Sequence, residues 1–416
     1  MTDIRVLGAG REVGRSAIHV DTGSEKFLLD YGIEVQDGNA PISPKLDLAA
    51  VLLSHAHVDH SGMTPELYKR GYTGSIYALP ATFDLCDILL YDSIKVQEKK
   101  GQTPHFMIHD IKQMFRKREE TRYMQKLSFG KSTVEFRDAG HIPGSASIII
   151  EHGGKRILYT GDIKFMDTSL MKGADDTMKD IDVIISESTY SYGNHPDRKK
   201  LTDKLREIIQ ETYYQGGTTI LPCFAIGRTQ ELLTLVYDLG VPMVVDGMGR
   251  DATDAILNNP NSIREHKVLQ KAFGMARRIK RRKDREITIE RPSVIMTTAG
   301  MLSGGPVGYY IGKLHDRDDC SLILTGYQVE GTVGRVLMDT GRYKNEGLNV
   351  KVKNRFEFLD LSAHTDRDHL LKFYKKLNPE KIVLVHGDHR IEDFAQDLKK
   401  MGFDAVAPEN GQKVKI

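Results

Sequence analysis

The hydrophobic pattern of the N-terminal part of the chain predicts short strands rather than long helices. Apolar residues come in brief runs separated by glycines and turn residues, which is typical of β-structure. One polar stretch, from His105 to Lys131, instead carries Ile108, Ile111, Met114 and Phe115 at helical spacing and is expected to be helical. The predicted strands are Ile4–Leu7, Ala17–Val20, Lys26–Leu29, Val51–Leu53, Thr133–Phe136, Ser147–Ile150, Arg156–Tyr159 and Val183–Ile185.

From about Asp197 the pattern changes to an alternation of strands and helices. Such an alternation predicts a parallel sheet covered by helices on both faces. The tail from about Phe356 continues as strand, helix, strand, helix and a last short strand. The expected helices are Arg198–Tyr214, Thr229–Leu239, Asp251–Leu257, Val307–His315 and Val333–Asp339, and the expected strands are Thr219–Leu221, Pro242–Val245, Val294–Thr297, Ser321–Leu324 and Lys381–Val385.

Composition narrows the class of protein. A length of 416 residues suggests two or three domains, and a hydrophobic content of 40% excludes a disordered chain. No apolar run is long enough to cross a membrane, and the N-terminus lacks the pattern of a signal peptide. The cysteines Cys86, Cys223 and Cys320 are too scattered for a disulfide framework, so we expect a cytoplasmic protein.

The strongest chemical feature is a histidine cluster at residues 54–60, Ser-His-Ala-His-Val-Asp-His, directly after a predicted strand. Imidazole and carboxylate ligands together suit zinc, manganese or iron. In an extended segment His55 and His57 point the same way, whereas the adjacent Asp59 and His60 point differently. One short loop can therefore supply ligands to two separate metal ions.

Further candidate ligands stand in the same setting elsewhere in the chain. His141, Asp162 and His386 each lie at or just beyond the end of an apolar strand run. Active-site residues collect at the carboxyl ends of strands, where loops converge. Together with residues 55–60, these three side chains are expected to complete a metal centre.

These motifs resemble those of the β-CASP family of metallo-β-lactamase-fold ribonucleases. The resemblance is carried by the early Asp30, the H-x-H-x-D-H cluster and the later Gly-His and Gly-Asp pairs. It extends to Glu187, His364 and His386, which resemble the three β-CASP motifs, and to the segments 222–231 and 298–305. Within the family, the chain is similar to archaeal homologues of the nuclease subunit of the cleavage and polyadenylation specificity factor that lack KH domains.

The resemblance implies a role for each site residue and two Zn²⁺ per chain. One zinc would take His55, His57 and His141, the other Asp59, His60 and His386, and Asp162 would bridge them. Asp30 would orient a ligand histidine or loop. The implied catalytic residues are Asp59, Asp162, His364 as general acid and Glu187 as its partner.

The positions of the ligands predict the domain organisation. Asp162 precedes the strand–helix block and His386 follows it, so the metal site closes only if both flanks belong to one domain. The expected fold class is α/β: a discontinuous metallo-β-lactamase αββα sandwich, 1–191 and 358–416, with an inserted parallel-sheet β-CASP domain, 192–357. A cleft between the domains is the expected substrate site.

Candidate substrate contacts are basic or glycine-rich. Arg277, Arg278, Lys280 and Arg281 begin a basic segment that reaches Arg285 and could track a phosphate backbone; a solvated helix face is the alternative. A second basic stretch, 112–126, also contains acidic residues and is more typical of a surface helix. Three further candidates for phosphate contacts are Arg228, Ser303 and Gly304.

The favoured function is a zinc-dependent ribonuclease that cuts single-stranded RNA internally, with 5′→3′ trimming left open, in RNA 3′-end processing or decay. The alternatives are a hydrolase of a small thioester, lactam or lactone, a DNA nuclease, and a non-catalytic RNA-processing subunit. Every ligand position is filled, which disfavours the last, and His386 resembles the RNA-directed branch. A homodimer and other RNA-processing proteins are open as partners. The formal net charge of +2 by itself disfavours nucleic acid binding. It is a sum over the whole chain, however, in which acidic residues elsewhere cancel the charge of a local basic segment.

Overall fold

The computed structural model describes residues 2–416 and divides into two compact units. Unit 1 comprises Met1–Asp167, Lys172–Asn194 and His364–Ile416, and unit 2 comprises Thr168–Met171 and His195–Ala363. Unit 1 thus draws segments from both sides of unit 2 in the sequence. The boundaries of the functional domains, 1–191 with 358–416 and 192–357, stay a prediction.

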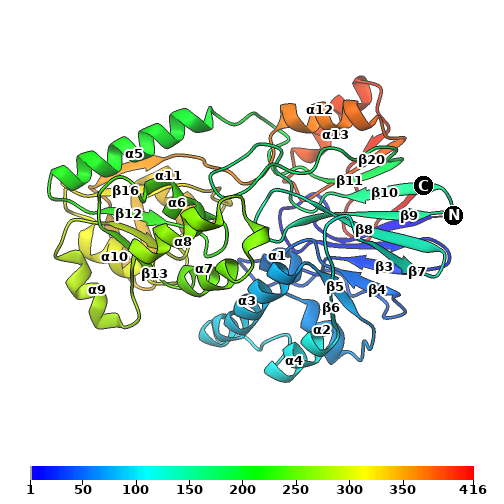
Figure 1. Cartoon of the computed structure of the whole chain (residues 1–416), viewed down its shortest axis with the longest axis horizontal. Helices are drawn as coiled ribbons and strands as arrows, with labels where there is room; N and C mark the ends of the chain where they lie inside the picture. The colour runs from blue at the N-terminus through cyan, green and yellow to red at the C-terminus, as the bar shows by residue number, and fades with distance from the viewer. Residues whose placement is uncertain (1) are drawn as a thin grey trace. The chain divides into compact units, whose positions relative to one another are not determined.

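Unit 1 is built on two seven-stranded sheets. Figure 1 shows α2, α3 and α4 on the outer side of the first sheet and α12 and α13 on the outer side of the second. The helices are α1 (Val58–Ser61), α2 (Thr64–Lys69), α3 (Pro80–Lys99), α4 (Ile108–Arg116), α12 (Arg367–Leu377) and α13 (Ile391–Lys400). The first sheet runs in the order β22 (Lys413–Lys415), β1 (Asp3–Gly8), β2 (Ala17–Asp21), β3 (Lys26–Leu29), β4 (Ala50–Leu52), β5 (Ile76–Ala78) and β6 (Arg118–Glu120). The second runs in the order β21 (Ala405–Val406), β20 (Lys381–Val385), β11 (Val183–Glu187), β10 (Lys155–Tyr159), β9 (Ala146–His152), β8 (Ser132–Asp138) and β7 (Lys126–Phe129).

The middle of the second sheet is buried on both faces, and the three consecutive isoleucines of β9 show this. Ile148 and Ile150 belong to the core between the two sheets, whereas Ile149 belongs to the core under α12 and α13. Side chains alternate between the faces of a strand, so a strand between two hydrophobic layers needs apolar residues at every position. This arrangement is the expected αββα sandwich.

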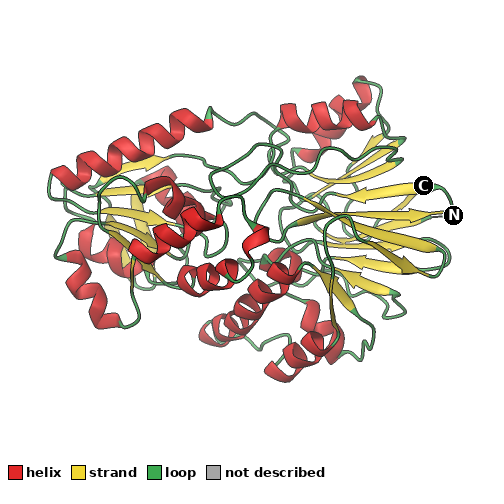
Figure 2. Cartoon of the chain, in the orientation of Figure 1, coloured by secondary structure: helices red, strands yellow, loops and turns green. Residues whose placement is uncertain are grey.

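Unit 2 contains a six-stranded sheet in which every pair of neighbours is parallel. Helix α5 begins where the Asp197 carboxylate accepts a hydrogen bond from the backbone N–H of Lys199, at 2.8 Å. Figure 2 shows helices around this sheet, and the predicted strand–helix alternation is confirmed. The strand order is β14 (Arg277–Arg278), β13 (Met243–Asp246), β15 (Val294–Thr297), β12 (Thr219–Pro222), β16 (Ser321–Leu324) and β19 (Arg355–Phe358). The other elements are α5 (Arg198–Tyr214), α6 (Arg228–Val236), α7 (Gly249–Leu257), a 3₁₀ turn (Pro260–Ser262), α8 (His266–Met275), α9 (Arg282–Ile289), α10 (Val307–Leu314), α11 (Val333–Thr340) and the hairpin β17 (Arg342–Asn345) and β18 (Leu348–Lys351).

The prediction of a helical stretch from His105 to Lys131 is wrong beyond Arg116. Helix α4 ends there, β6 pairs with β5 at the edge of the first sheet, and β7 pairs with β8. Pairing with a neighbouring strand satisfies the backbone of these polar residues, and this tertiary gain overrides their local preference. The long helix α3 was not predicted, although Pro80 at its first position and the spacing of Phe83, Leu90 and Ile94 indicate a helix.

None of the helices formed by residues 2–416 combines the length and apolarity that crossing a bilayer requires.

The core between the sheets is expected to dominate the stability of unit 1. Phe136 is fully buried there, and Phe136→Ala should lower the free energy of unfolding by about 3–5 kcal/mol, because a cavity adds to the lost burial. Urea unfolding followed by circular dichroism measures the change, with Val35→Ala, at a site 54% exposed, as the control. A loss below about 1 kcal/mol for Phe136→Ala would contradict this expectation.

Candidate metal centre

The histidine cluster forms the turn between β4 and α1 at one end of the sandwich. The strand ends at Leu52, His57 caps the helix, and Asp59 and His60 lie on its single turn. Asp59 and His60 therefore point in different directions because they are helical, not because the segment is extended. The Gly32 Cα packs against the Asp59 backbone so closely that a Cβ there would lie 1.8 Å from the Asp59 carbonyl oxygen. Only glycine fits beside this turn.

The first ligand group consists of His55, His57, His141 and Asp162. Nδ1 of His57 lies 3.2 Å from Nε2 of His55 and 3.2 Å from Nε2 of His141. Oδ2 of Asp162 lies 3.5 Å from Nε2 of both His55 and His141. Four ligand atoms from three separate loops thus face a common point.

The second group consists of Asp59, His60 and His386, next to the other oxygen of Asp162. Oδ1 of Asp162 lies 3.3 Å from Nε2 of His60 and 3.4 Å from Nδ1 of His386. Oδ2 of Asp59 lies 3.4 Å from Nε2 of His386. The two oxygens of one carboxylate thus face two different sets of ligand atoms. Glu187, Asp162 and His386 form a third group of possible metal ligands, which the sequence did not predict.

These distances fit bound metal ions. Ligands at 2.0–2.1 Å from a tetrahedral zinc are about 3.4 Å from one another, which is the spacing found in both groups. Oδ1 of Asp162 is buried and forms no hydrogen bond within the described residues. A buried carboxylate oxygen without a hydrogen-bond donor is costly unless a cation faces it.

Burial sets the charge state of His55 and His57. Burial lowers the pKa of His57, and burial together with the neighbouring His60 holds the pKa of His55 well below its usual range. Both rings are therefore neutral near pH 7, the form that offers a lone pair to a metal. Burial alone would raise the pKa of Asp162, but His386 and His60 outweigh it and hold that pKa well below its usual range.

Asp30 orients the ring of His60. Its Oδ2 accepts a hydrogen bond from Nδ1 of His60 at 2.7 Å, which leaves Nε2 of the same ring directed at Asp162. The same carboxylate accepts hydrogen bonds from the Ser54 hydroxyl at 2.6 Å and from the Tyr159 hydroxyl at 2.8 Å. Sequence reasoning missed Tyr159, whose only signal was its place at the end of β10, just before Gly161 and Asp162.

Glu187 and His364 form a pair beside the first ligand group. Nδ1 of His364 lies 3.1 Å from both carboxylate oxygens of Glu187 and 3.9 Å from Oδ2 of Asp162. Burial lowers the pKa of His364, but the charges of Glu187 and Asp162 outweigh it and raise the pKa to about 9. With Nδ1 donating to a carboxylate, Nε2 is the ring atom that can give a proton away.

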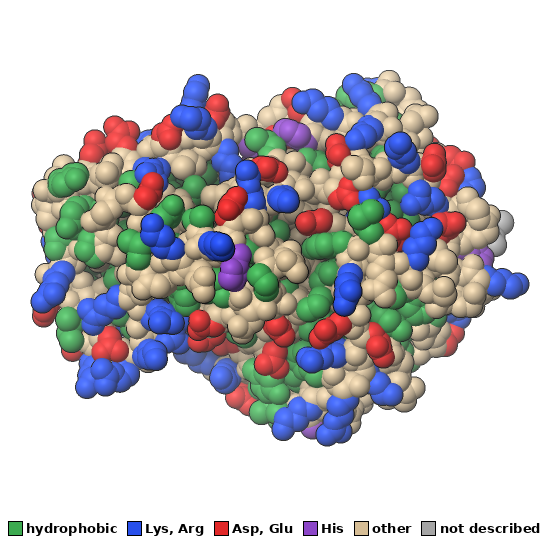
Figure 3. All heavy atoms as spheres, viewed as in Figure 1, with side chains coloured by type: hydrophobic (Ala, Val, Ile, Leu, Met, Phe, Trp, Pro, Cys, Tyr) green, Lys and Arg blue, Asp and Glu red, His purple; other side chains and the backbone are tan. Residues whose placement is uncertain are grey.

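The predicted basic segment of unit 2 is not one helix. Arg277 and Arg278 form the edge strand β14, and Lys280 lies in the loop. Arg281 directly precedes α9 and forms an ion pair with Asp284 at 3.2 Å. All four side chains are exposed, and Figure 3 shows Lys and Arg side chains gathered over α9. These residues therefore remain available to a ligand.

The other predicted contacts differ in exposure. Arg228 is 6% exposed and pairs with Glu231 at 2.6 Å, so its guanidinium is a weaker candidate for RNA than the exposed arginines. Ser303 is exposed in a turn where Leu302, Gly304 and Gly305 have φ of 63°, 80° and 69°. Glycine favours this left-handed backbone.

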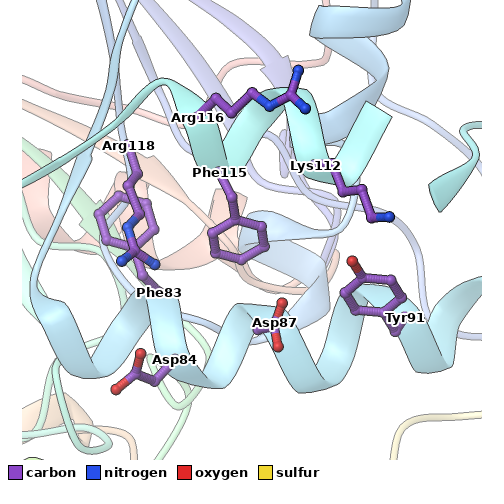
Figure 4. Close-up of a pocket in the computed structure, with 8 residues that line it drawn as sticks. All are labelled: Phe83, Asp84, Asp87, Tyr91, Lys112, Phe115, Arg116 and Arg118. Atoms are coloured by element: carbon purple, nitrogen blue, oxygen red, sulfur yellow. The ribbon is translucent and has the colours of Figure 1, made fainter. Parts of the chain in front are cut away.

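A surface pocket of about 520 Å³ lies between α3 and α4 of unit 1. Figure 4 shows Phe115 pointing from α4 towards α3, with Asp87 and Tyr91 on the facing helix. Its basic side chains, Lys112, Arg116 and Arg118, come from the second basic stretch. Carboxylates are mixed among them, so this surface does not form a uniformly basic track for phosphates. The lining residues are Phe83, Asp84, Asp87, Tyr91, Lys112, Phe115, Arg116 and Arg118.

Comparison with known families covers most of the chain. Residues 12–189 match the metallo-β-lactamase superfamily domain, residues 229–337 match the Beta-Casp domain, and residues 349–408 match the Zn-dependent metallo-hydrolase RNA specificity domain. A solved structure from Enterococcus faecalis V583, titled as a protein of unknown function, superposes with a TM-score of 0.65 over 100% of both chains. At 14% identity this likeness shows the fold alone.

Three relatives with high coverage of this chain are archaeal proteins. The chain is 36% identical to "Probable RNase MJ4" of Methanocaldococcus jannaschii over 100% of both chains. It is 33% identical to "RNase aCSPSF2" of Saccharolobus solfataricus, over 99% of this chain and 85% of the relative. It is 31% identical to "Transcription termination factor FttA" of M. jannaschii, over 96% of this chain and 69% of the relative. The chain therefore belongs to the β-CASP family of metallo-β-lactamase-fold ribonucleases, which are metal-dependent hydrolases.

Proposed function

We propose that this protein is a zinc-dependent ribonuclease that hydrolyses phosphodiester bonds of single-stranded RNA at the centre around Asp162. The observation that carries the proposal is one buried carboxylate facing two sets of ligand atoms at metal-ligand spacing. Its relatives named as ribonucleases support RNA as the substrate. Internal cleavage is the proposed main activity, in RNA processing or decay, and 5′→3′ trimming is an additional activity that the same chemistry allows.

Two zinc ions per chain fit the donor set. His55, His57 and His141 would hold one ion, Asp59, His60 and His386 the other, and Asp162 would contact both. Bound divalent ions supply Lewis-acid activation of water and neutralise the charge that develops on the phosphate. Tyr159 and Asp30 hold the His60 ring in the orientation that this role requires.

The protein's own proton donor would be His364. A departing ribose oxygen needs a proton, and the carboxylates of Glu187 and Asp162 keep the His364 ring protonated near neutral pH. Glu187 also fixes the orientation of the ring through the hydrogen bond from Nδ1. Nε2 then delivers the proton while Glu187 stabilises the imidazole that remains.

A measurement of zinc affinity tests the proposed role of the Asp30 carboxylate. Asp30→Asn should weaken zinc binding by about 10–100-fold, because the amide no longer fixes the orientation of the His60 ring. Competition with a chromogenic zinc chelator measures the affinity, and Asp21→Asn, which changes a carboxylate at the end of β2, is the control. Unchanged affinity for Asp30→Asn would remove Asp30 from this role.

RNA cleavage tests the function itself. Wild-type protein should cleave 5′-labelled single-stranded RNA in the presence of zinc, and a chelator should abolish this activity. His57→Ala should be inactive, and His364→Ala should lose about 10²–10⁴-fold in rate if His364 is the general acid. Single-stranded DNA of the same sequence serves as the competing substrate, and His109→Ala, an exposed histidine, serves as the control.

The absence of zinc-dependent RNA cleavage, or full activity in His57→Ala, would contradict the proposed function. Product lengths separate internal cuts from 5′ trimming. A blocked 5′ end should stop only the trimming activity.

Exposed basic residues of unit 2 are the proposed contacts with the RNA backbone. Arg277→Ala and Lys280→Ala should each weaken RNA binding and lower the slope of log affinity against log salt by about 0.7. Fluorescence anisotropy with labelled single-stranded RNA, in the presence of chelator, measures both quantities. Lys267→Ala on α8 is a matched exposed control, and equal effects of all three variants would leave only a general charge effect.

A further inference from the structure

Lys164 is a buried lysine for which the proposed chemistry has no role so far. It follows Asp162 by two positions and is 3% exposed. Its ammonium group donates a hydrogen bond to the backbone carbonyl oxygen of His364 at 2.8 Å. Burying an ammonium group costs free energy unless the group has a hydrogen-bond or ionic partner. A lysine at this buried position therefore needs an explanation.

This hydrogen bond is one of two that hold the same peptide group. The carbonyl of His364 and the N–H of Thr365 belong to the same peptide unit. The carbonyl accepts from Lys164, and the N–H donates to the carbonyl oxygen of Ile163 at 2.7 Å. The consecutive residues Ile163 and Lys164 therefore fix the peptide group that joins His364 to Thr365.

The same short segment also holds Glu187. The backbone N–H of Ile163 donates to Oε1 of Glu187 at 2.8 Å, and the Glu187 carboxylate in turn faces Nδ1 of His364. Residues 162–164 thus present a carboxylate to the ligand groups and hold both partners of the Glu187–His364 pair. The hydrogen bond from the Lys164 side chain can be removed by substitution while the Glu187–His364 pair itself stays intact.

The support for Lys164 is itself rigid. Its backbone N–H donates to the carbonyl oxygen of Ala139 at 2.9 Å, and its carbonyl accepts from the N–H of Ala174 at 2.7 Å. Ala139 precedes the ligand candidate His141 by two positions. His364, in contrast, lies in the irregular segment between β19 and α12, where no sheet fixes the backbone.

We propose that Lys164 is a positioning residue, which holds the backbone of His364 so that its ring stays aligned with Glu187 for proton transfer to the leaving oxygen. This inference rests on the proposed function. Catalysis by a general acid requires precise placement, and small displacements of a catalytic group cost large factors in rate. Lys164 acts through His364 and does not itself need to touch the RNA.

The leaving group provides a test that a purely structural role would not pass. RNA expels an alkoxide that needs a proton, whereas bis(p-nitrophenyl) phosphate expels p-nitrophenolate, which is stable as an anion and needs none. Lys164→Met should lower kcat for RNA about tenfold or more, with KM unchanged, and leave hydrolysis of bis(p-nitrophenyl) phosphate within about twofold of wild type. Lys164→Arg, which keeps a donor, should retain most of the RNA activity.

Zinc content and thermal unfolding are measured on every variant. Lys69→Met is the matched control, because Lys69 also donates to a backbone carbonyl, that of His105, at 2.6 Å. Equal losses on both substrates, loss of zinc from Lys164→Met, or undiminished RNA cleavage would each overturn the inference. If Lys164→Met does not fold, Lys164→Leu, which also lacks a donor, takes its place under the same criteria.

A double-mutant cycle separates this inference from the proposed function. In a His364→Ala background, Lys164→Met should have no further effect on RNA cleavage, because the group that it positions is gone. Independent, multiplicative losses would overturn the role of Lys164. If His364→Ala itself has no effect, the proposed general acid is wrong. If His364→Ala impairs cleavage and Lys164→Met does not, only the inference about Lys164 fails.

Discussion

The buried carboxylate of Asp162 is the point on which the centre depends. It is 2% exposed and faces five imidazole rings, those of His55, His60, His141, His364 and His386. A charged group in such a place is stable only among compensating charges and donors. The ligand loops, the Glu187–His364 pair and the orienting carboxylate of Asp30 are arranged around this requirement.

Two stacked sheets place the compensating side chains around Asp162. Each sheet delivers polar side chains where strands end, from β3, β4, β8, β10, β11 and β20, while the strands themselves fill hydrophobic cores. Asp30 and His386 have φ of 57° and 50°, a left-handed backbone that costs about 1–3 kcal/mol in a non-glycine residue. The backbone N–H groups of Asp30 and His386 donate to the carbonyl oxygens of Leu52 and Ala9, respectively, and these hydrogen bonds help to maintain this conformation. The sheets thus stabilise the strained positions from which these side chains reach the site.

The near-neutral net charge of +2 disguises a strongly uneven distribution. Exposed arginines and lysines gather around β14 and α9, whereas the metal centre of unit 1 combines buried carboxylates with the neutral rings of His55 and His57. Bound cations would add positive charge to that centre, and a residue count omits them. Arg228 differs from these exposed arginines, because it is buried and forms an ion pair with Glu231.

The sequence alone determined the two fold classes and most of the ligand candidates. Apolar runs such as Ile148–Ile150 predict buried strands, and the cluster at 55–60 predicts metal binding whatever surrounds it, because both signals are local. Tertiary structure decided what local signals cannot contain. Residues 118–120 became an edge strand because β5 offered a partner, and Tyr159 and Lys164 acquired roles only when folding placed Asp30 and His364 beside them. A hydrogen bond between residues 129 or 200 positions apart leaves no pattern in a single sequence, since neither partner has a fixed spacing to the other.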